Sequence, residues 1–376
     1  MKRSIVLKTG RLDVHVQNTI FPLETLCGFA SRNNPKRGYL FVSKVLGKHY
    51  PVKPSMMRNI YQILGKQLAC MDLQEPVLAV GMAETATGFG QGVFEELMLA
   101  APALDGLYIH TTRYGLARKQ ALAFKESHSH ATDHILYEPC IEKDRELFYQ
   151  AQTLILLDDE ISTGATFENL INGFKAINPH LQRVVLVSIT NWMNPDLQKN
   201  LIERVNTSLR FVNILKGRFS FVADTSFQSA ARVGLSIRNN EPKDHCLPRN
   251  FGRLGYRNAP PINMSQIAAQ LNLLTADRVL VLGTGEFNFL PFKLAEIVEK
   301  KGIDVFFQST TRSPILIDGE IHCKISFKDN YFDGIDNFIY NVRPKEYSKI
   351  IVCYETMGLP RDHQLINALN AQPVFF

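Results

Sequence analysis

Two adjacent acids and a run of small polar residues stand together in LILLDDEISTGATF, residues 154–167. Asp158 and Asp159 end an apolar run, and ionised carboxylates accept hydrogen bonds from hydroxyl groups and bind divalent cations. A predicted helix follows, and its N-terminus offers backbone N–H groups and hydroxyls to an anion such as phosphate. The residues that would line this anion site are Ser162, Thr163, Gly164, Ala165 and Thr166. The spacing predicts a site that binds a phosphate together with sugar hydroxyls or a divalent cation.

An ordinary capped helix is the alternative interpretation of this stretch. Ser162 or Thr163 would then be the N-cap and would satisfy one backbone N–H group of the helix. A hydroxyl cap leaves both acids unexplained, so we favour the anion site.

A basic run, TTRYGLARKQALAFKESHSHATDHILY, covers residues 111–137. Imidazoles at short spacing can share a metal ion, although no Cys or further His cluster is present to complete a set of zinc ligands. A solvated helix face is the simpler alternative. The cations and histidines of the run are Arg113, Arg118, Lys119, Lys125, His128, His130 and His134.

Short apolar runs that alternate with amphipathic stretches would position these residues. The runs PVLAVG (76–81), GLYIHT (106–111), TLILLD (153–158) and RVVLVSI (183–189) are typical of strands buried on both faces, and QGVFEELMLAAPAL (91–104) and TFENLINGFKAI (166–177) are typical of helices. The alternation predicts an α/β fold with a parallel sheet and crossover helices. Ligands of such sheets bind at the carboxyl ends of the strands.

The second part of the chain repeats features of the first. RVLVLGTGEF (278–287) resembles PVLAVGMAET (76–85), FQSTTRSPI (307–315) resembles YIHTTRYGL (108–116), and KIIVCYETMGLP (349–360) resembles TLILLDDEISTG (153–164). Three matches in the same order predict two related α/β halves. Tyr354 and Glu355 replace the two acids in the second half, so we expect only the first half to carry the site.

The length and composition agree with a two-domain soluble protein. The chain has 376 residues and a formal net charge of +6, without the long Lys/Arg tract that would indicate nucleic acid or a membrane surface. Its 6 cysteines include no CxxC pair, and no run is long and apolar enough to span a bilayer. We therefore expect a reduced, cytoplasmic protein with small anionic substrates, and neither nucleic acid nor membrane as a partner.

The motif LILLDDEISTGAT resembles the phosphoribosyl pyrophosphate (PRPP) loop of type I phosphoribosyltransferases. The resemblance implies that Asp158 and Asp159 bind the ribose 2′ and 3′ hydroxyls, and that Thr163, Gly164, Ala165 and Thr166 bind the 5′-phosphate. It also implies that VGMAETATGFGQG (80–92) is the pyrophosphate loop, with Mg²⁺ near Glu84, Asp158 and Asp159. The residues of that loop are Gly81, Met82, Ala83, Glu84 and Thr85; an ordinary strand-to-helix turn is the alternative for it.

The resemblance extends over nearly the full chain to one subgroup, which has a C-terminal TRSP domain and occurs in gene clusters related to tellurium resistance. The signature stands at Thr311, Arg312, Ser313 and Pro314. The basic run resembles the catalytic flap of this family, which brings cations over the departing pyrophosphate, and its candidates are Arg113, Lys119, Lys125 and His128. Near the N-terminus, Arg37, Lys44, Lys48 and His49 are either substrate ligands or surface charge beside an edge strand.

The resemblance implies an enzyme that uses Mg-PRPP to transfer a 5-phosphoribosyl group to a nitrogenous base or amine and releases pyrophosphate. The acceptor is not specified, and the N-terminal region or residues 219–232 are its candidate ligands. The alternatives are a PRPP-sensing regulator without turnover and an interaction protein whose second half is an inactive duplicate. We expect a transferase domain over residues 1–215, a linker or hood over 216–262 and a TRSP domain over 263–376. Related transferases are often dimers.

Overall fold

The computed structural model describes residues 1–34, 37–125, 133–227, 242–257 and 262–376. A seven-stranded sheet forms the first half, in the order β1-β2-β11-β10-β9-β5-β6. All neighbours from β11 to β6 are parallel, whereas β1 and β2 add an antiparallel edge. The strands are β1 (Lys2–Leu7), β2 (Gly10–Thr19), β5 (Val77–Gly81), β6 (Gly106–His110), β9 (Thr153–Ile161), β10 (Arg183–Asn191) and β11 (Ser208–Ala223).

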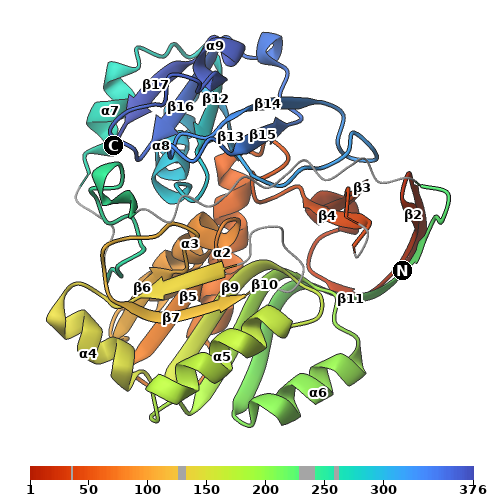
Figure 1. Ribbon diagram of the computed structural model, residues 1–376, viewed down its shortest axis with the longest axis vertical. Coiled ribbons are helices and arrows are strands. Elements are labelled where there is room, and N and C mark those ends of the chain that lie inside the picture. Colours follow the sequence, from red (N-terminus) through yellow and green to blue (C-terminus); the bar gives the residue numbers. More distant parts are fainter. Residues whose placement is uncertain (35–36, 126–132, 228–241, 258–261) are drawn as a thin grey trace.

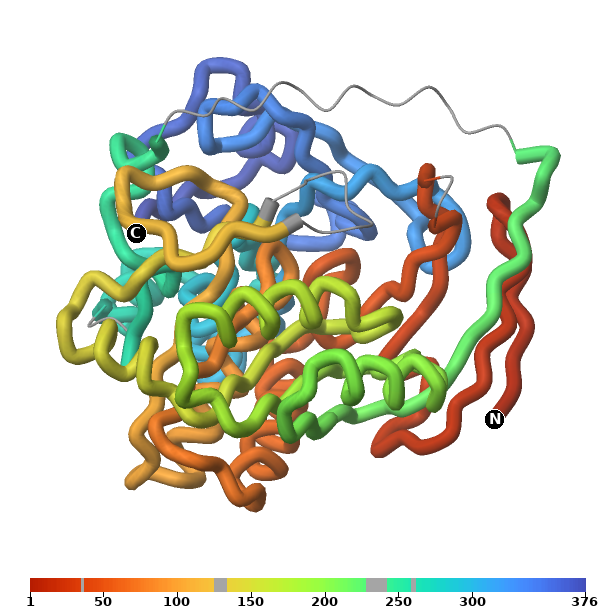
Figure 2. Tube along the Cα trace, turned by 60° about the horizontal axis from the view of Figure 1, so that its bottom comes forward, coloured from red at the N-terminus to blue at the C-terminus, as the bar shows by residue number. Residues whose placement is uncertain are grey.

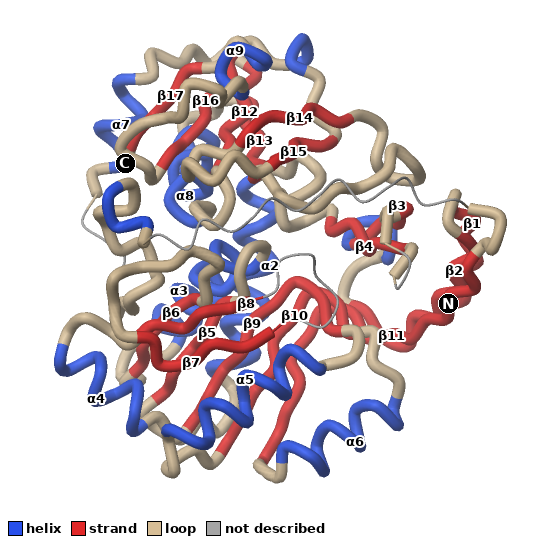
Figure 3. Tube along the Cα trace, in the orientation of Figure 1, coloured by secondary structure: helices blue, strands red, loops and turns tan. Residues whose placement is uncertain are grey.

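Helices cover both faces of this sheet (Figures 1 and 3). One face carries α5 (Ala165–Ile177) and α6 (Pro195–Val205), with α4 (Glu142–Gln150) at the β6 edge. The other carries α2 (Pro54–Ala69) and α3 (Ala86–Ala100). In α5 the buried residues Phe167, Leu170, Ile171 and Phe174 repeat at helical spacing, so one stripe faces the core. The predicted fold class, a mostly parallel α/β sheet with flanking helices, is confirmed.

A second parallel sheet of four strands lies beyond α2 and α3, in the order β13-β12-β16-β17 (Figure 1). Its strands are β12 (Arg278–Gly283), β13 (Asp304–Ser309), β16 (Lys349–Tyr354) and β17 (Gln372–Phe375), and its helices are α7 (Met264–Gln270), α8 (Phe289–Lys300) and α9 (Leu365–Leu369). This order matches β6-β5-β9-β10 of the large sheet. A helix follows both β5 and β12, and an antiparallel hairpin follows both β6 and β13: β7 (Gln120–Lys125) with β8 (Asp133–Tyr137), and β14 (Lys324–Lys328) with β15 (Asp336–Tyr340).

The two halves share one hydrophobic core. Figure 2 shows the second half lying along the first, and a single cluster of buried side chains runs from the large sheet through α2 and α3 into α8 and β12. Gly88 allows the close approach of α3 to α8, because a Cβ there would lie 2.8 Å from the Cβ of Asn288. The second half therefore packs on the first as part of one structure, not as a separate unit on a linker.

A small hairpin near the N-terminus is also held by the second half. It follows α1 (Leu23–Leu26) and consists of β3 (Cys27–Ser31) and β4 (Tyr39–Ser43). On the far side of β3, the backbone N–H of Leu316 donates to Ser31 and that of Glu320 donates to Phe29. Lys44 also pairs with Glu320 at 2.9 Å. The second half thus supports both the hairpin and the large sheet.

Several element bounds differ from the sequence-based expectation. Strand β9 continues to Ile161, so Asp158 and Asp159 lie inside the strand and not after it. Helix α3 begins at Ala86, so most of the Gly-rich stretch is helical. The basic run forms the β7–β8 hairpin, which makes the solvated-helix interpretation wrong. The boundary predicted at residue 215 falls within β11, which pairs with β2 as far as Ala223.

Two short 3-10 helices, η1 (Lys243–His245) and η2 (Pro344–Glu346), lie in the second part of the chain. No helix in the described part of the chain is long and apolar enough to cross a membrane.

Candidate active site

Parallel pairing of β5 with β9 brings the two predicted loops together. Gly81 is the partner of Leu157, the residue before Asp158, and the Met82 N–H donates to the Leu157 carbonyl at 2.9 Å. The loop that follows β5 therefore begins beside the acids of β9. This is the carboxyl edge of the parallel strands, where α/β sheets bind ligands.

The acids of β9 lie half-buried in a row of three. Asp158 accepts a hydrogen bond from the Asp159 N–H at 2.9 Å, and Glu160 pairs with Arg37 at 2.7 Å. Burial raises the pKa of Asp159, while the positive charges of Arg37 and Lys48 act in the opposite direction. Arg37 was one of the N-terminal residues with two interpretations, and the structure places it against this row. Glu160 was not singled out from the sequence, because it stands in the variable part of the motif.

The loop Ser162–Thr163–Gly164 leads directly into α5. Gly164 is the N-cap with φ of +77°, and no side chain caps the helix. A Cβ at Gly164 would lie 2.9 Å from Leu201 and would also require a left-handed backbone, which disfavours any other residue. The Thr163 hydroxyl accepts from the Ala165 N–H at 3.5 Å, but the N-cap position itself is taken by Gly164 and not by Ser162 or Thr163. Thr163 is exposed, and Ala165 and Thr166 open the helix.

The loop after β5 is held against the start of the loop after β6. The Thr111 hydroxyl accepts from the Ala83 N–H at 2.9 Å, and the Thr111 N–H donates to the Gly81 carbonyl at 3.0 Å. The Ala83–Glu84 peptide bond is cis, and Thr85 precedes α3 as its N-cap. The five residues from Gly81 to Thr85 thus form an ordered connection, held at both neighbouring strands.

Glu84 is buried in this loop and surrounded by cations. Lys48 lies 2.6 Å from one carboxylate oxygen, and Arg312 lies 3.9 Å from the other. Burial acts to raise the pKa of Glu84, but Lys48, Arg312 and Arg113 together lower it below the ordinary value. The sequence suggested two interpretations of Lys48, and its ammonium is fully enclosed here. Arg312 was named only as part of the TRSP signature, and no local pattern connects it to Glu84.

The three predicted metal ligands differ in how well they fit a divalent cation. Asp158 and Asp159 present hard oxygen donors at the sheet edge, which suit Mg²⁺. The Glu84 carboxylate is already paired with Lys48 and does not fit. Within the described residues, no three His, Cys, Asp or Glu side chains gather into a metal-binding group.

The predicted flap residues are not all brought to this edge. Arg113 lies there, with its guanidinium 3.4 Å from the Ala83 carbonyl. Lys119 pairs with Glu138 at 2.7 Å beside α4, with its side chain 77% exposed. His134 is buried, stacks on Phe124 and bonds the Thr111 hydroxyl at 3.0 Å. His128, His130 and the side chain of Lys125 lie outside the described residues.

Two known family models match the chain, one in each half. A family model described as "Phosphoribosyl transferase" matches residues 26–218. The chain belongs to this family. A second model, described as "TRSP domain C terminus to PRTase_2", matches residues 251–369. The chain is therefore an enzyme of the pentosyltransferase class, and the predicted resemblance to phosphoribosyltransferases with a C-terminal TRSP domain is confirmed.

Similar solved structures are also phosphoribosyltransferases. Adenine phosphoribosyl transferase from Trypanosoma brucei is 13% identical, with a TM-score of 0.36, over 56% of this chain and 86% of that one. Adenine phosphoribosyltransferase from Leishmania donovani is 15% identical, with a TM-score of 0.35, over 51% and 77%. Orotate phosphoribosyltransferase from Francisella tularensis is 14% identical, with a TM-score of 0.30, over 47% and 69%. No curated protein matches the chain.

Proposed function

We propose that this phosphoribosyl transferase uses Mg-PRPP and transfers the 5-phosphoribosyl group to a nitrogenous base or amine, with release of pyrophosphate. The observation that carries the proposal is the position of the Gly81–Thr85 loop, with Lys48 and Arg113 at Glu84, directly beside the acids of β9. Cations at one loop and carboxylates at the next match a substrate that carries a pyrophosphate on one side of C1 and sugar hydroxyls on the other.

The residues would divide the work of binding PRPP between the two loops. Asp158 and Asp159 would accept hydrogen bonds from the ribose 2′ and 3′ hydroxyls, and residues 163–166 would hold the 5′-phosphate at the start of α5. Arg113 would act on the pyrophosphate, and Lys48, whose ammonium is held by Glu84, would add positive charge beside it. Mg²⁺ bound with PRPP supplies charge neutralisation for the leaving group.

The displacement itself depends on position and electrostatics. The nitrogen of the acceptor forms a bond to C1 while the bond from C1 to the pyrophosphate oxygen breaks, and pyrophosphate leaves with that electron pair. Positive charge develops on the ribose during this step, and the carboxylates of Asp158 and Asp159 would stabilise it, while the cations of the other loop would stabilise the leaving anion. The acceptor nitrogen then releases its proton to water, and neither aspartate is assigned as the general base.

Pyrophosphate release from PRPP tests the proposal. The full chain is incubated with PRPP, Mg²⁺ and a panel of purines, pyrimidines and amines, and compared with the Asp158→Asn/Asp159→Asn variant. We expect Mg²⁺-dependent release with at least one acceptor and a loss of at least 100-fold, on the order of two charge-assisted hydrogen bonds, in the double variant. Asp72→Asn is the matched control, because this carboxylate is 80% exposed and far along the chain from the motif.

Equal activity in the unsubstituted and doubly substituted chains would overturn the assignment of the site. PRPP binding without release for any acceptor would instead favour the alternative of a non-catalytic PRPP sensor.

A further inference from the structure

The TRSP loop, residues Thr310–Pro314 after β13, reaches from the second half to the Gly81–Thr85 loop of the first. The Thr310 carbonyl accepts from the Lys48 ammonium at 2.8 Å, while Lys48 also binds Glu84. The Arg312 guanidinium lies 4.7 Å from the ring centre of Tyr114 and 3.9 Å from Glu84. The second half therefore places one cation at the first-half loop and anchors another.

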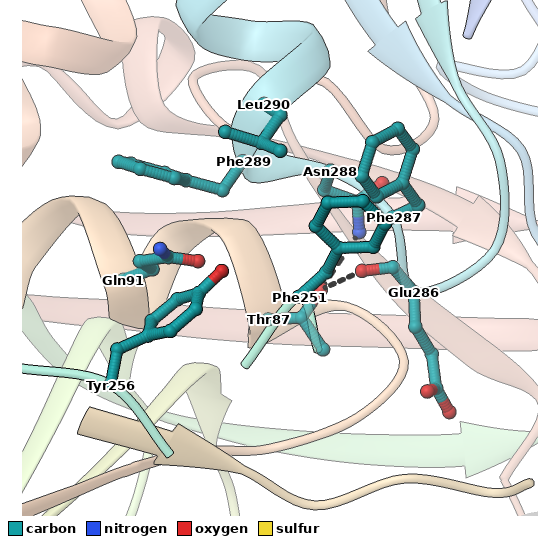
Figure 4. Close-up of a pocket in the computed structure, with 9 residues that line it drawn as sticks. All are labelled: Thr87, Gln91, Phe251, Tyr256, Glu286, Phe287, Asn288, Phe289 and Leu290. Carbon is teal, nitrogen blue, oxygen red and sulfur yellow. Dashed lines mark hydrogen bonds between the residues drawn. The ribbon is translucent and has the colours of Figure 1, made fainter. Parts of the chain in front are cut away.

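The two halves exchange contacts in both directions at this point. Glu286, in the loop after β12, accepts from the Thr112 hydroxyl at 2.6 Å and from the Arg113 N–H at 2.7 Å. One hydrogen bond occurs at the same position in both halves. In the first half the Thr111 hydroxyl accepts from the Ala83 N–H, and in the second half the Thr310 hydroxyl accepts from the Gly285 N–H at 2.9 Å. Figure 4 shows the Glu286 carbonyl bonded by Thr87 of α3, with the carboxylate pointing away from the small cavity lined by Gln91 and Tyr256.

The two equivalent loops differ in the cations that surround them. In the second half, Arg253 binds both oxygens of Glu355 at 2.6 and 2.7 Å and also contacts Glu286 at 3.0 Å, and all three residues are buried. One cation therefore fills the space between two carboxylates. In the first half, Lys48, Arg113 and Arg312 lie around Glu84, with Asp158 and Asp159 on the neighbouring strand. Three cations therefore lie around the first loop, whereas Arg253 alone lies between the two carboxylates of the second.

Arg312 has donors that the described part of the chain leaves unused. Its Nε and Nη2 atoms are buried and have no hydrogen-bond acceptor among the described residues, and the 3.9 Å separation from Glu84 is too long for a hydrogen bond. The Arg312 side chain as a whole is 15% exposed. Buried guanidinium donors are costly without acceptors, and a planar guanidinium matches phosphate oxygens well.

We propose that Arg312 binds the pyrophosphate group of PRPP, so that the TRSP half completes the active site of the first half. This proposal rests on the proposed function, because it names a ligand of the same substrate. The second half supplies Arg312 to the first. In the second half, the corresponding place beside Glu286 and Glu355 is already occupied by Arg253. The TRSP signature is then a substrate-binding loop and not solely a packing element.

Direct binding measurements on the full chain test the role of Arg312. Isothermal titration with Mg-PRPP, Mg-pyrophosphate and ribose 5-phosphate is compared between the unsubstituted chain, Arg312→Gln and Arg312→Lys. We expect Arg312→Gln to weaken PRPP and pyrophosphate binding roughly 10- to 100-fold and to leave ribose 5-phosphate binding unchanged. Arg312→Lys should recover part of the affinity, because it restores the charge without the planar fork.

Lys53→Gln is the matched control for the contact between the halves. Lys53 pairs with Asp304 at the opposite end of β13 from the TRSP loop, so its loss disturbs the same interface away from the site. Pyrophosphate affinity should be unchanged in this variant.

The possible outcomes separate the two proposals. If the unsubstituted chain binds neither PRPP nor pyrophosphate, both proposals are wrong. If it binds them and Arg312→Gln binds them equally well, only the role of Arg312 is wrong. A parallel loss of ribose 5-phosphate affinity in Arg312→Gln would indicate a general structural defect and would also overturn the role of Arg312.

Discussion

The Lys48 ammonium lies 2.6 Å from the Glu84 carboxylate, and both side chains are almost completely buried. The Thr310 carbonyl of the second half accepts a further hydrogen bond from Lys48. One ion pair therefore joins the N-terminal region, the loop after β5 and the TRSP loop. A buried pair of this kind makes removal of one partner far more costly than removal of a surface charge.

Lys48→Met should lower the free energy of unfolding by about 3–5 kcal/mol, because it leaves the Glu84 carboxylate buried without its closest cation. Chemical denaturation at neutral pH measures the change. Lys199→Met is the matched control, since its pair with Glu203 is exposed and should contribute less than about 0.5 kcal/mol. An equal loss of unfolding free energy in the two variants would show that the Lys48–Glu84 pair stabilises the fold no more than a surface pair does. The double change Lys48→Met/Glu84→Gln should recover part of the loss.

Arg37→Gln should raise the pH below which PRPP binding weakens. In the proposed site, the ionised carboxylate of Asp159 accepts hydrogen bonds from the ribose hydroxyls, and burial already raises its pKa. As the pH falls through this raised pKa, Asp159 is protonated earlier than an exposed aspartate, and binding weakens. The charge of Arg37 opposes the shift, so its removal raises the pKa of Asp159 further.

Titration of PRPP affinity between about pH 4 and 8, the range around the ordinary aspartate value, measures this shift. Arg11→Gln is the control, because the Arg11 side chain is 61% exposed and pairs only with the nearby Asp13 in the described structure. If binding weakens below the same pH in Arg37→Gln as in the unsubstituted chain, the coupling between Arg37 and Asp159 is contradicted.

Gly164→Ala should weaken both the fold and phosphate binding. The φ of +77° at Gly164 costs an alanine roughly 1 kcal/mol or more, and its Cβ would lie 2.9 Å from Leu201. The start of α5 must then shift, so we expect loss of ribose 5-phosphate affinity together with a lower Tm. Gly358→Ala is the control, since a Cβ there meets no atom within 4 Å. Unchanged ribose 5-phosphate affinity in Gly164→Ala would argue against a phosphate site at this helix.

Local pattern was sufficient for four parallel strands of the large sheet, whereas β1, β2 and β11 were not predicted. Strands β5, β6, β9 and β10 begin within one residue of the predicted runs, because each is an apolar segment buried on both faces. Their ends were less predictable. Polar residues such as Asp158 and Glu160 continue β9, since parallel pairing with β10 satisfies their backbone groups as far as Ile161. The helix α3 likewise starts early, because its glycines allow close packing against Asn288, Tyr108 and Tyr61 and do not form a long loop.

The sequence alone determined the fold class, the family and the place of the two acids, because these depend on periodicity and on a compact motif within one strand and turn. The tertiary structure decided which distant charges meet there. Lys48, Arg113 and Arg312 come from three separate loops, and their approach to Glu84 depends on how α3 packs against α8 and β13 against residues 47–52. Contacts between loops carry no periodicity, so they follow from the packing of the helices and strands that support them.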